Sequence, residues 1–343
     1  MESRYHDRIR FCTTTPYRTA AGHRRRSHPT RHLFPRRAAA ARERRAPRQH
    51  RRTRRLAGAP GTHPAAPAAR AAGTRHHPCR RRPNAANWRT STDDELLAVT
   101  SIGKDYVWLT EQVALVKSQH AQFSEDIFSF YNIFAPATYL KFALGGDDQL
   151  VNFVNGHSKQ AIQHIFDIVS QDIADLAVAV IKQGSADGIY YSTQNIQSTS
   201  DQTIFNQWVK PSDLTVLKAA KAAGGTNVLH ICGYEGASNR LTDFSDYPAD
   251  IVNWATAVEG VTLSQGRSIF PNQVLLGGFG NTTKDVLYQG TIDDIAAATQ
   301  AIITAFGDDT RFLIGADCTV PRDIDLKHLE AARKAAVKQP ITV

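Results

Sequence analysis

Between residues 86 and 343 the sequence alternates short apolar segments with longer segments of helical periodicity. The apolar segments predict strands at 127–134, 187–192, 227–232, 250–254, 273–278 and 311–316. They lack the regular alternation of apolar and polar residues that a strand with one solvated face shows, which is typical of strands buried on both faces. Such strands, separated by helices, predict βαβ units and a parallel sheet.

Four helices are predicted between and after these strands, at 157–183, 211–223, 292–306 and 326–337. In the first helix, apolar residues recur every three or four positions from Ile162 to Val180, and Gly184 follows as a stop signal. Pro211 suits the first turn of the second helix, because the N–H that proline lacks has no partner in that turn.

The number of units favours a (β/α)8 TIM barrel. Six βα units fit in 258 residues, and no Gly-x-Gly-x-x-Gly sequence follows a first strand, as a dinucleotide-binding sheet would require. A complete barrel needs eight strands, and the sequence shows six. The first two strands would occupy about 50–90 residues. That is the length of the segment before residue 86, which therefore stands where those strands belong.

The segment 1–85 differs in composition from the rest of the chain. Residues 1–82 hold 23 Arg, no Lys and three acidic residues, which gives a formal charge of +20. Residues 83–343 hold 18 basic and 29 acidic residues, which gives −11, so the total of +9 describes neither part. The Arg-rich segment buries too little apolar surface to offset the entropy lost on ordering, and we expect it to be disordered.

Three hypotheses explain the Arg-rich segment: out-of-frame translation of a GC-rich gene, a basic arm that binds nucleic acid, or an organellar targeting peptide. The abrupt change from Arg alone to Lys-rich usage favours the first. We therefore divide the chain into an Arg-rich segment, 1–85, and a barrel domain, 86–343. Nucleic acid is expected as a partner only if the Arg-rich segment is genuine. In one alternative the whole chain is the inactive product of a frame-shifted gene with a basic arm.

The location of the protein is predicted from three further features. No apolar run approaches the roughly 20 residues that a membrane helix needs, and no secretory signal pattern opens the chain. Four Cys in 343 residues do not form a disulfide scaffold. We expect a cytoplasmic protein without a membrane partner.

The predicted strand ends carry a possible metal site. Active sites of such barrels form at the carboxyl ends of the strands, and the third and sixth strands end near His230, Cys232 and Cys318. Residues two apart on a strand point to the same side, so His230 and Cys232 can bind one ion that Cys318 reaches from another strand. A His-Cys-Cys set with one open position is typical of catalytic zinc. The alternative is that both Cys are small buried apolar residues and the His is structural.

Four other residues near strand ends are candidates. Tyr191, Asn253 and Gly278 are candidate substrate-binding residues. The alternatives are core packing for the tyrosine, a backbone hydrogen bond for the asparagine and close packing for the glycine. Asp317 can orient His230 from behind the metal site or cap a loop.

Four motifs together resemble the uroporphyrinogen decarboxylase superfamily over about residues 88–343. They are His-Ile-Cys-Gly at 230–233, Asp-Ile-Val-Asn-Trp at 250–254, Gly-Gly-Phe-Gly-Asn at 277–281, and Cys318 followed by Pro321. Within that superfamily, His-x-Cys with a late Cys resembles the zinc motif of the cobalamin-linked methyltransferases. The resemblance implies one (β/α)8 barrel with zinc at His230, Cys232 and Cys318. It also implies methyl transfer between a corrinoid, which a partner protein can carry, and a thiol such as coenzyme M.

The chain departs from the decarboxylases of the superfamily. Their Arg-Gln-Ala-Gly-Arg-Tyr substrate motif and early catalytic Asp are absent, and Asn253-Trp254 stands where they tend to have Asp-Trp. The decarboxylases also use no metal. Decarboxylation of a porphyrinogen in tetrapyrrole metabolism therefore remains the alternative function, and bound zinc distinguishes the two.

Overall fold

The computed structural model describes residues 85–122, 127–194, 202–307 and 310–337. These residues fall within one compact unit of the chain. The Arg-rich segment lies outside the described residues. Two expectations, that it is disordered and that it stands in place of the first two barrel strands, therefore stay predictions.

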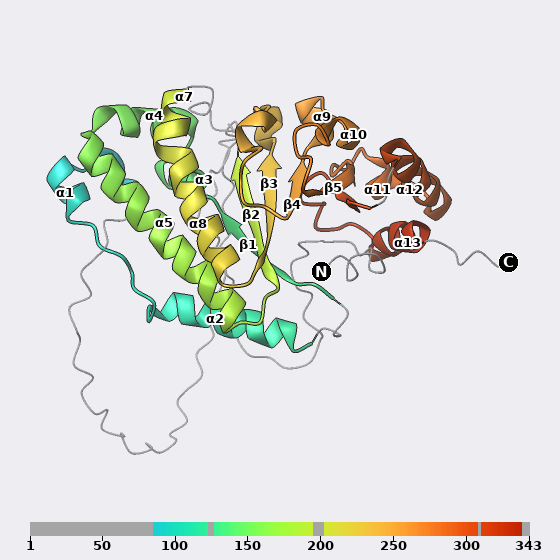
Figure 1. Ribbon diagram of the computed structural model, residues 1–343, viewed down its shortest axis with the longest axis horizontal. Coiled ribbons are helices and arrows are strands. Elements are labelled where there is room, and N and C mark those ends of the chain that lie inside the picture. The colour runs from blue at the N-terminus through green and yellow to red at the C-terminus, as the bar shows by residue number, and fades with distance from the viewer. Residues whose placement is uncertain (1–84, 123–126, 195–201, 308–309, 338–343) are drawn as a thin grey trace, which may run out of the picture. The chain divides into compact units, whose positions relative to one another are not determined.

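Six parallel strands form one sheet in which each strand pairs with the next strand of the sequence. The strands are β1 (Phe130–Phe134), β2 (Gly188–Gln194), β3 (Thr226–Cys232), β4 (Ile251–Trp254), β5 (Val274–Phe279) and β6 (Phe312–Ala316). Every predicted strand is present, and helical segments connect each strand to the next one (Figure 1). The sequence-ordered parallel sheet is the arrangement of a TIM barrel, with six of its strands described.

The four predicted helices are confirmed as α5 (Lys159–Lys182), α8 (Lys210–Ala222), α12 (Ile292–Phe306) and α13 (Leu326–Ala336). The sequence analysis missed three further helices of nine residues or more, which are α2 (Val107–His120), α3 (Pro136–Leu144) and α4 (Asp147–Gly156). Short helices complete the described part: α1 (Asp93–Leu97), α7 (Gln202–Ile204), α9 (Thr256–Glu259), α10 (Leu263–Gly266) and α11 (Val286–Gln289). Helical turns of other types are η2 (Ala85–Thr90), η3 (Phe205–Val209), η4 (Tyr234–Gly236) and η5 (Leu241–Phe244).

Helix α3 was missed because the sequence around Pro136 was interpreted only as the end of a strand. In the structure Pro136 is the first residue of α3, where its fixed φ suits a helix start. Gly145 ends the helix with a φ of 95°, a value that glycine adopts without strain. The short interval between β1 and α3 places this helix at the carboxyl end of β1.

Two apolar clusters lie on the two faces of the sheet. The larger cluster packs the strands against the helices, as with Phe166, Leu217 and Ile295. The smaller lies on the opposite, interior face of the strands and contains Val228, Ile251, Leu276, Phe130, Tyr190, Val274 and Leu313. The strand register continues this interior face toward the carboxyl ends with more polar residues, because Ser192, His230 and Asn253 are aligned in one row. The apolar layer thus supports a polar layer at the barrel mouth.

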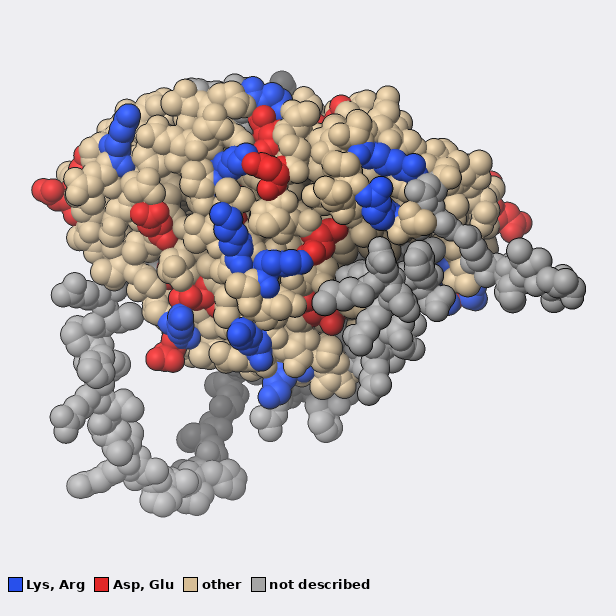
Figure 2. Space-filling view, in the orientation of Figure 1, with Lys and Arg blue, Asp and Glu red and all other residues tan. Residues whose placement is uncertain are grey.

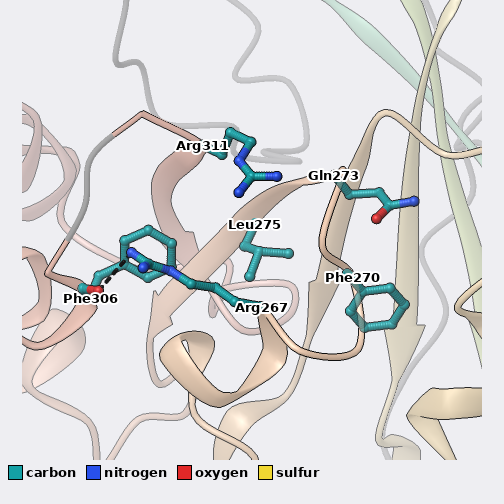
Figure 3. A pocket seen from close by; sticks show the side chains of 6 residues that line it. All are labelled: Arg267, Phe270, Gln273, Leu275, Phe306 and Arg311. Atoms are coloured by element: carbon teal, nitrogen blue, oxygen red, sulfur yellow. Dashed lines mark hydrogen bonds between the residues drawn. The ribbon is translucent and has the colours of Figure 1, made fainter.

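At the amino ends of β5 and β6, a pocket is lined by Arg267, Phe270, Gln273, Leu275, Phe306 and Arg311 (Figure 3). The guanidinium of Arg267 lies 4.1 Å from the centre of the Phe306 ring and donates a 2.8 Å hydrogen bond to the Phe306 carbonyl oxygen. Because Phe306 is the last residue of α12, Arg267 satisfies a carbonyl group at the helix end. The pocket therefore lies away from the carboxyl ends of the strands.

On the face that Figure 2 shows, Lys and Arg side chains are interspersed with Asp and Glu. A nucleic-acid footprint would gather basic residues instead. Within the described residues, no helix combines the length and the apolar character needed to cross a membrane.

Candidate metal centre

The three predicted metal ligands lie together at the carboxyl end of the sheet. His230 and Cys232 belong to β3, and Cys318 follows β6 by two residues. The sulfur of Cys318 lies 3.8 Å from the sulfur of Cys232 and 3.4 Å from Nε2 of His230. One ligand atom from each residue lies within 4.8 Å of the other two. Two side chains of β3 and one that follows β6 thus lie together at this end of the sheet.

Asn253 determines which nitrogen of His230 faces the two cysteines. The side-chain nitrogen of Asn253 donates to the carbonyl oxygens of Leu276 and Ala316, at 2.8 and 3.2 Å. Since a carbonyl can only accept, the amide orientation is fixed, and its Oδ1 faces Nδ1 of His230 at 2.5 Å. Nδ1 must therefore carry the proton of that hydrogen bond. Nε2, on the side of Cys318, is the nitrogen left to coordinate a metal.

The distances fit a tetrahedral ion. Zinc bound at about 2.3 Å by sulfur and about 2.0 Å by nitrogen in tetrahedral geometry places its ligand atoms roughly 3.5–3.8 Å apart. The sulfur–sulfur distance of 3.8 Å and the sulfur–nitrogen distance of 3.4 Å agree with these values. The donor set, two sulfurs and one imidazole nitrogen, is also one that zinc prefers. The residues present therefore fit a zinc ion with its fourth position left for another ligand.

The two cysteines differ in acidity because they are buried next to each other. Cys232 is 8% exposed, and His230 is 3% exposed. The hydrogen bond from Cys232 is the main cause that lowers the pKa of Cys318 below its usual range despite burial. The hydrogen bond to Cys318 and burial raise the pKa of Cys232. A proton held between two sulfurs is what a divalent cation displaces when it binds both as thiolates.

The two neighbouring tyrosines of β2 point to opposite faces of the sheet, as alternation along a strand requires. The hydroxyl of Tyr190 donates to Oδ1 of Asn253 at 2.8 Å, and its ring centre lies 5.3 Å from that of His230. The hydroxyl of Tyr191 instead donates to Asp213 of α8 at 2.6 Å, with the side chain fully buried. The tyrosine on the metal side is therefore Tyr190, whereas the sequence analysis had selected Tyr191.

Asp317 holds loops in place rather than His230. Its Oδ2 accepts from the backbone nitrogen and the hydroxyl of Thr256, at 2.8 and 2.6 Å, and its Oδ1 accepts from the backbone nitrogen of Gly278 at 3.3 Å. Burial raises the pKa of Asp317. The carboxylate thus ties the end of β6 to the loop after β4 and to β5. The partner that orients His230 is Asn253. Of the two alternatives for Asp317, orienting His230 or capping a loop, the structure shows the loop contact.

Gly278 faces the outer helices. Its φ of 115° favours glycine, and an added Cβ would lie 2.6 Å from Cγ2 of Ile302 on α12. Close packing, one of the two alternatives for this residue, is therefore what the structure shows. Asn253 also shows its backbone alternative, because its amide nitrogen binds two carbonyls. Substrate contact by Asn253, Gly278 or Tyr191 stays a prediction.

The sequence analysis missed a buried lysine beside the metal centre. Lys141 of α3 is 5% exposed, and its ammonium nitrogen lies 2.8 Å from Oδ1 of Asp147 and 5.3 Å from the ring centre of Tyr234. Tyr234 follows Cys232 by two residues. A lysine in a helical segment is usually a solvated residue, so the sequence carries no signal of this burial.

Comparisons with known proteins agree with this fold. The sequence model described as "Uroporphyrinogen decarboxylase (URO-D)" matches residues 104–339. The fold is similar to that of a methyltransferase from Methanosarcina mazei, with a TM-score of 0.55 and 17% identity over 69% of this chain and 67% of that one. A B12-independent methionine synthase from Shewanella sp. W3-18-1, solved with selenomethionine, gives a TM-score of 0.42 and 12% identity over 66% and 65%. A search of curated proteins gives no match.

Proposed function

Since the chain belongs to the uroporphyrinogen decarboxylase (URO-D) family, we propose that it transfers a methyl group between a corrinoid and a thiol at a zinc ion bound by His230, Cys232 and Cys318. The acceptor is a small-molecule thiol, and the corrinoid is free or carried by a partner protein. The finding that the fold is similar to that of a methyltransferase from Methanosarcina mazei is consistent with this proposal.

The observation that carries the proposal is the hydrogen-bonded set around His230. Asn253 holds the proton on Nδ1 and thereby directs Nε2 to the side on which both sulfurs lie. Tyr190 donates to the same oxygen of Asn253 and stacks near the imidazole, which restrains the ring further. A histidine that served only packing would not need its second nitrogen aimed at two cysteines.

The residues have distinct tasks in the proposed reaction. His230, Cys232 and Cys318 would hold the ion and would leave a position for the acceptor thiol. Bound zinc supplies Lewis acidity, which lowers the pKa of an incoming thiol and makes the nucleophilic thiolate available at neutral pH. Asn253 keeps His230 in the coordinating tautomer, and the apolar residues below, such as Val228 and Leu276, exclude water from the lower side of the site.

The experiment that tests the proposal measures zinc per chain in the purified full-length protein by elemental analysis. We expect about one zinc in the parent and much less in Cys232→Ser and Cys318→Ser. Tyr191→Phe, which removes a buried hydroxyl on the opposite face of β2, is the matched control and should keep the zinc. A folded parent protein without zinc would contradict the metal site and favour decarboxylation of a porphyrinogen, the alternative function.

A further inference from the structure

A buried positive charge, Lys141, lies over the ring of Tyr234, two residues after Cys232. The backbone nitrogen of Gln194, the residue in register with Cys232, donates to the hydroxyl of Thr138 on α3 at 3.1 Å. This contact holds α3 over the carboxyl ends of β2 and β3. Lys141 lies one helical turn further along α3, with its ammonium group over the ring of Tyr234.

The charge balance of the centre explains what such a cation can do. A divalent ion, two thiolates and a neutral imidazole sum to zero. A thiol acceptor that binds as its thiolate adds one negative charge in a place where His230 and Cys232 are almost fully buried. Burying an unpaired charge is costly, and a nearby cation reduces that cost more than it would in water.

Asp147 limits how much of the lysine charge is available. Its carboxylate forms an ion pair with Lys141, yet its side chain is 24% exposed, against 6% for the lysine side chain. Water therefore screens the negative partner more than the positive one. The effect of the pair on the metal centre is a net positive potential. Lys141 indeed favours the thiolate of Cys232, acting against the hydrogen bond to Cys318 and the burial that raise its pKa.

We propose that Lys141 is a positioning residue of the methyl transfer: its buried charge offsets the negative charge of the acceptor thiolate, and the ion pair with Asp147 sets the strength of that effect. This inference rests on the proposed function, because it needs a metal centre to which a thiol binds.

Other charged groups around the centre act in the opposite sense. Glu259 of α9 accepts two hydrogen bonds from Asn239, which also donates to the carbonyl oxygen of Cys232. Asp317 lies on the β6 side, bonded to Thr256 and Gly278. These carboxyl groups disfavour a further negative charge, and their pKa values are raised by burial. Among the described residues, Lys141 is the cation whose charge acts on Cys232 against the effect of these carboxyl groups.

The test uses the full chain loaded with Co²⁺ and the uncharged thiol 2-mercaptoethanol as probe. The absorption of thiolate-to-cobalt charge transfer reports thiol binding directly, without turnover. The variants are Lys141→Met, which keeps the size of the side chain, and Asp147→Asn, which removes the opposing charge. Lys218→Met, an exposed lysine on α8, is the control.

We expect Lys141→Met to weaken thiol binding at pH 7 about tenfold and to raise the pH at which half of the thiol binds. Asp147→Asn should move both quantities the other way, by about threefold or more, a result that a merely structural role of the pair would not give. Lys218→Met should resemble the parent. A parent that binds thiol while Lys141→Met and Asp147→Asn bind it equally well would overturn this inference alone. A parent protein that fails to bind cobalt, or that binds cobalt but no thiol, would overturn both the proposed function and this inference.

Discussion

At the scale of single residues, the account depends most on Asn253. Its amide is the one group of the site that contacts β5, the end of β6 and His230 at once. The sequence analysis weighed a substrate contact against a backbone hydrogen bond for this residue. Which of two nitrogens a histidine presents cannot be read from spacing, because it depends on a partner on another strand.

Replacing Asn253 by Leu, which has a similar size, should lower the affinity for zinc about 10–100-fold. The reason is that Nδ1 of His230 loses the acceptor that holds its proton. Competition with a chromophoric chelator measures the affinity. Tyr190→Phe, which removes only the second hydrogen bond to Asn253, serves as control and should have a smaller effect. Equal zinc affinity in Asn253→Leu and the parent would show that Asn253 does not orient His230 for metal binding.

Asp213 predicts a pH dependence of stability that is independent of the metal. Asp213 lies on α8, fully buried against the outer face of β2. Burial raises its pKa to about 7, although hydrogen bonds from Tyr191 and Tyr247 act to lower that pKa. Its folded pKa lies above 3.8, the ordinary pKa of an exposed aspartate carboxyl. The folded state therefore binds the proton more tightly than the unfolded state. This contribution to stability is complete below about pH 4 and is lost as the pH rises through about 7.

Urea unfolding of the parent should therefore show a free energy of unfolding that decreases between pH 5 and pH 7.5 through this group. Asp213→Asn, which cannot ionise, should flatten that part of the profile, whereas Asp105→Asn on an exposed loop should leave it unchanged. The same slope in the parent and Asp213→Asn would mean that Asp213 is ionised throughout.

At the scale of elements, the site depends on how β5 ends. Gly277 and Gly278 have φ values of 152° and 115°, which L side chains rarely adopt. The backbone nitrogen of Gly278 thereby reaches Asp317, and the chain packs directly against α12. For Gly278 the sequence analysis left two alternatives open, contact with a substrate and close packing.

The matched pair Gly278→Ala and Gly224→Ala tests this packing. Both glycines have positive φ, but an added Cβ meets Ile302 at 2.6 Å in the first and nothing within 4 Å in the second. Gly224→Ala should cost only the backbone strain of about 1–2 kcal/mol. Gly278→Ala should cost roughly 1–3 kcal/mol more, because a well-packed contact must shift. Chemical denaturation of both variants measures the difference, and equal losses would argue against close packing at Gly278.

At the scale of the whole molecule, the sequence predicted the repeating architecture and the residues that meet at its mouth. All six strands and the four long amphipathic helices were recognised, because a strand buried on both faces and a one-sided helix leave strong periodic signals. Helix α2 was missed because few of its residues, such as Leu109 and Val113, are buried. Lys141 was missed because its burial depends on Tyr234 and Asp147, which come from other elements.

The same scale explains why the meeting of the three candidate ligands could be predicted and the contacts that support them could not. A TIM barrel brings the carboxyl ends of all strands to one face, so His230, Cys232 and Cys318 meet by topology alone. The choice of Tyr190 over Tyr191 depends on a shift of one residue along β2, which sequence periodicity does not resolve. Topology therefore predicts which segments meet at the barrel mouth, and the strand register decides which side chains of those segments face it.

The most direct test of the central claim is X-ray absorption at the zinc edge of the full-length protein. The account predicts a four-coordinate ion with two sulfur neighbours at about 2.3 Å and nitrogen or oxygen neighbours at about 2.0 Å. In the small fraction of Cys318→Ser that still holds zinc, the sulfur contribution should fall to one neighbour. A spectrum without sulfur neighbours, or one that Cys232→Ser and Cys318→Ser leave unchanged, would contradict a catalytic zinc site at His230, Cys232 and Cys318.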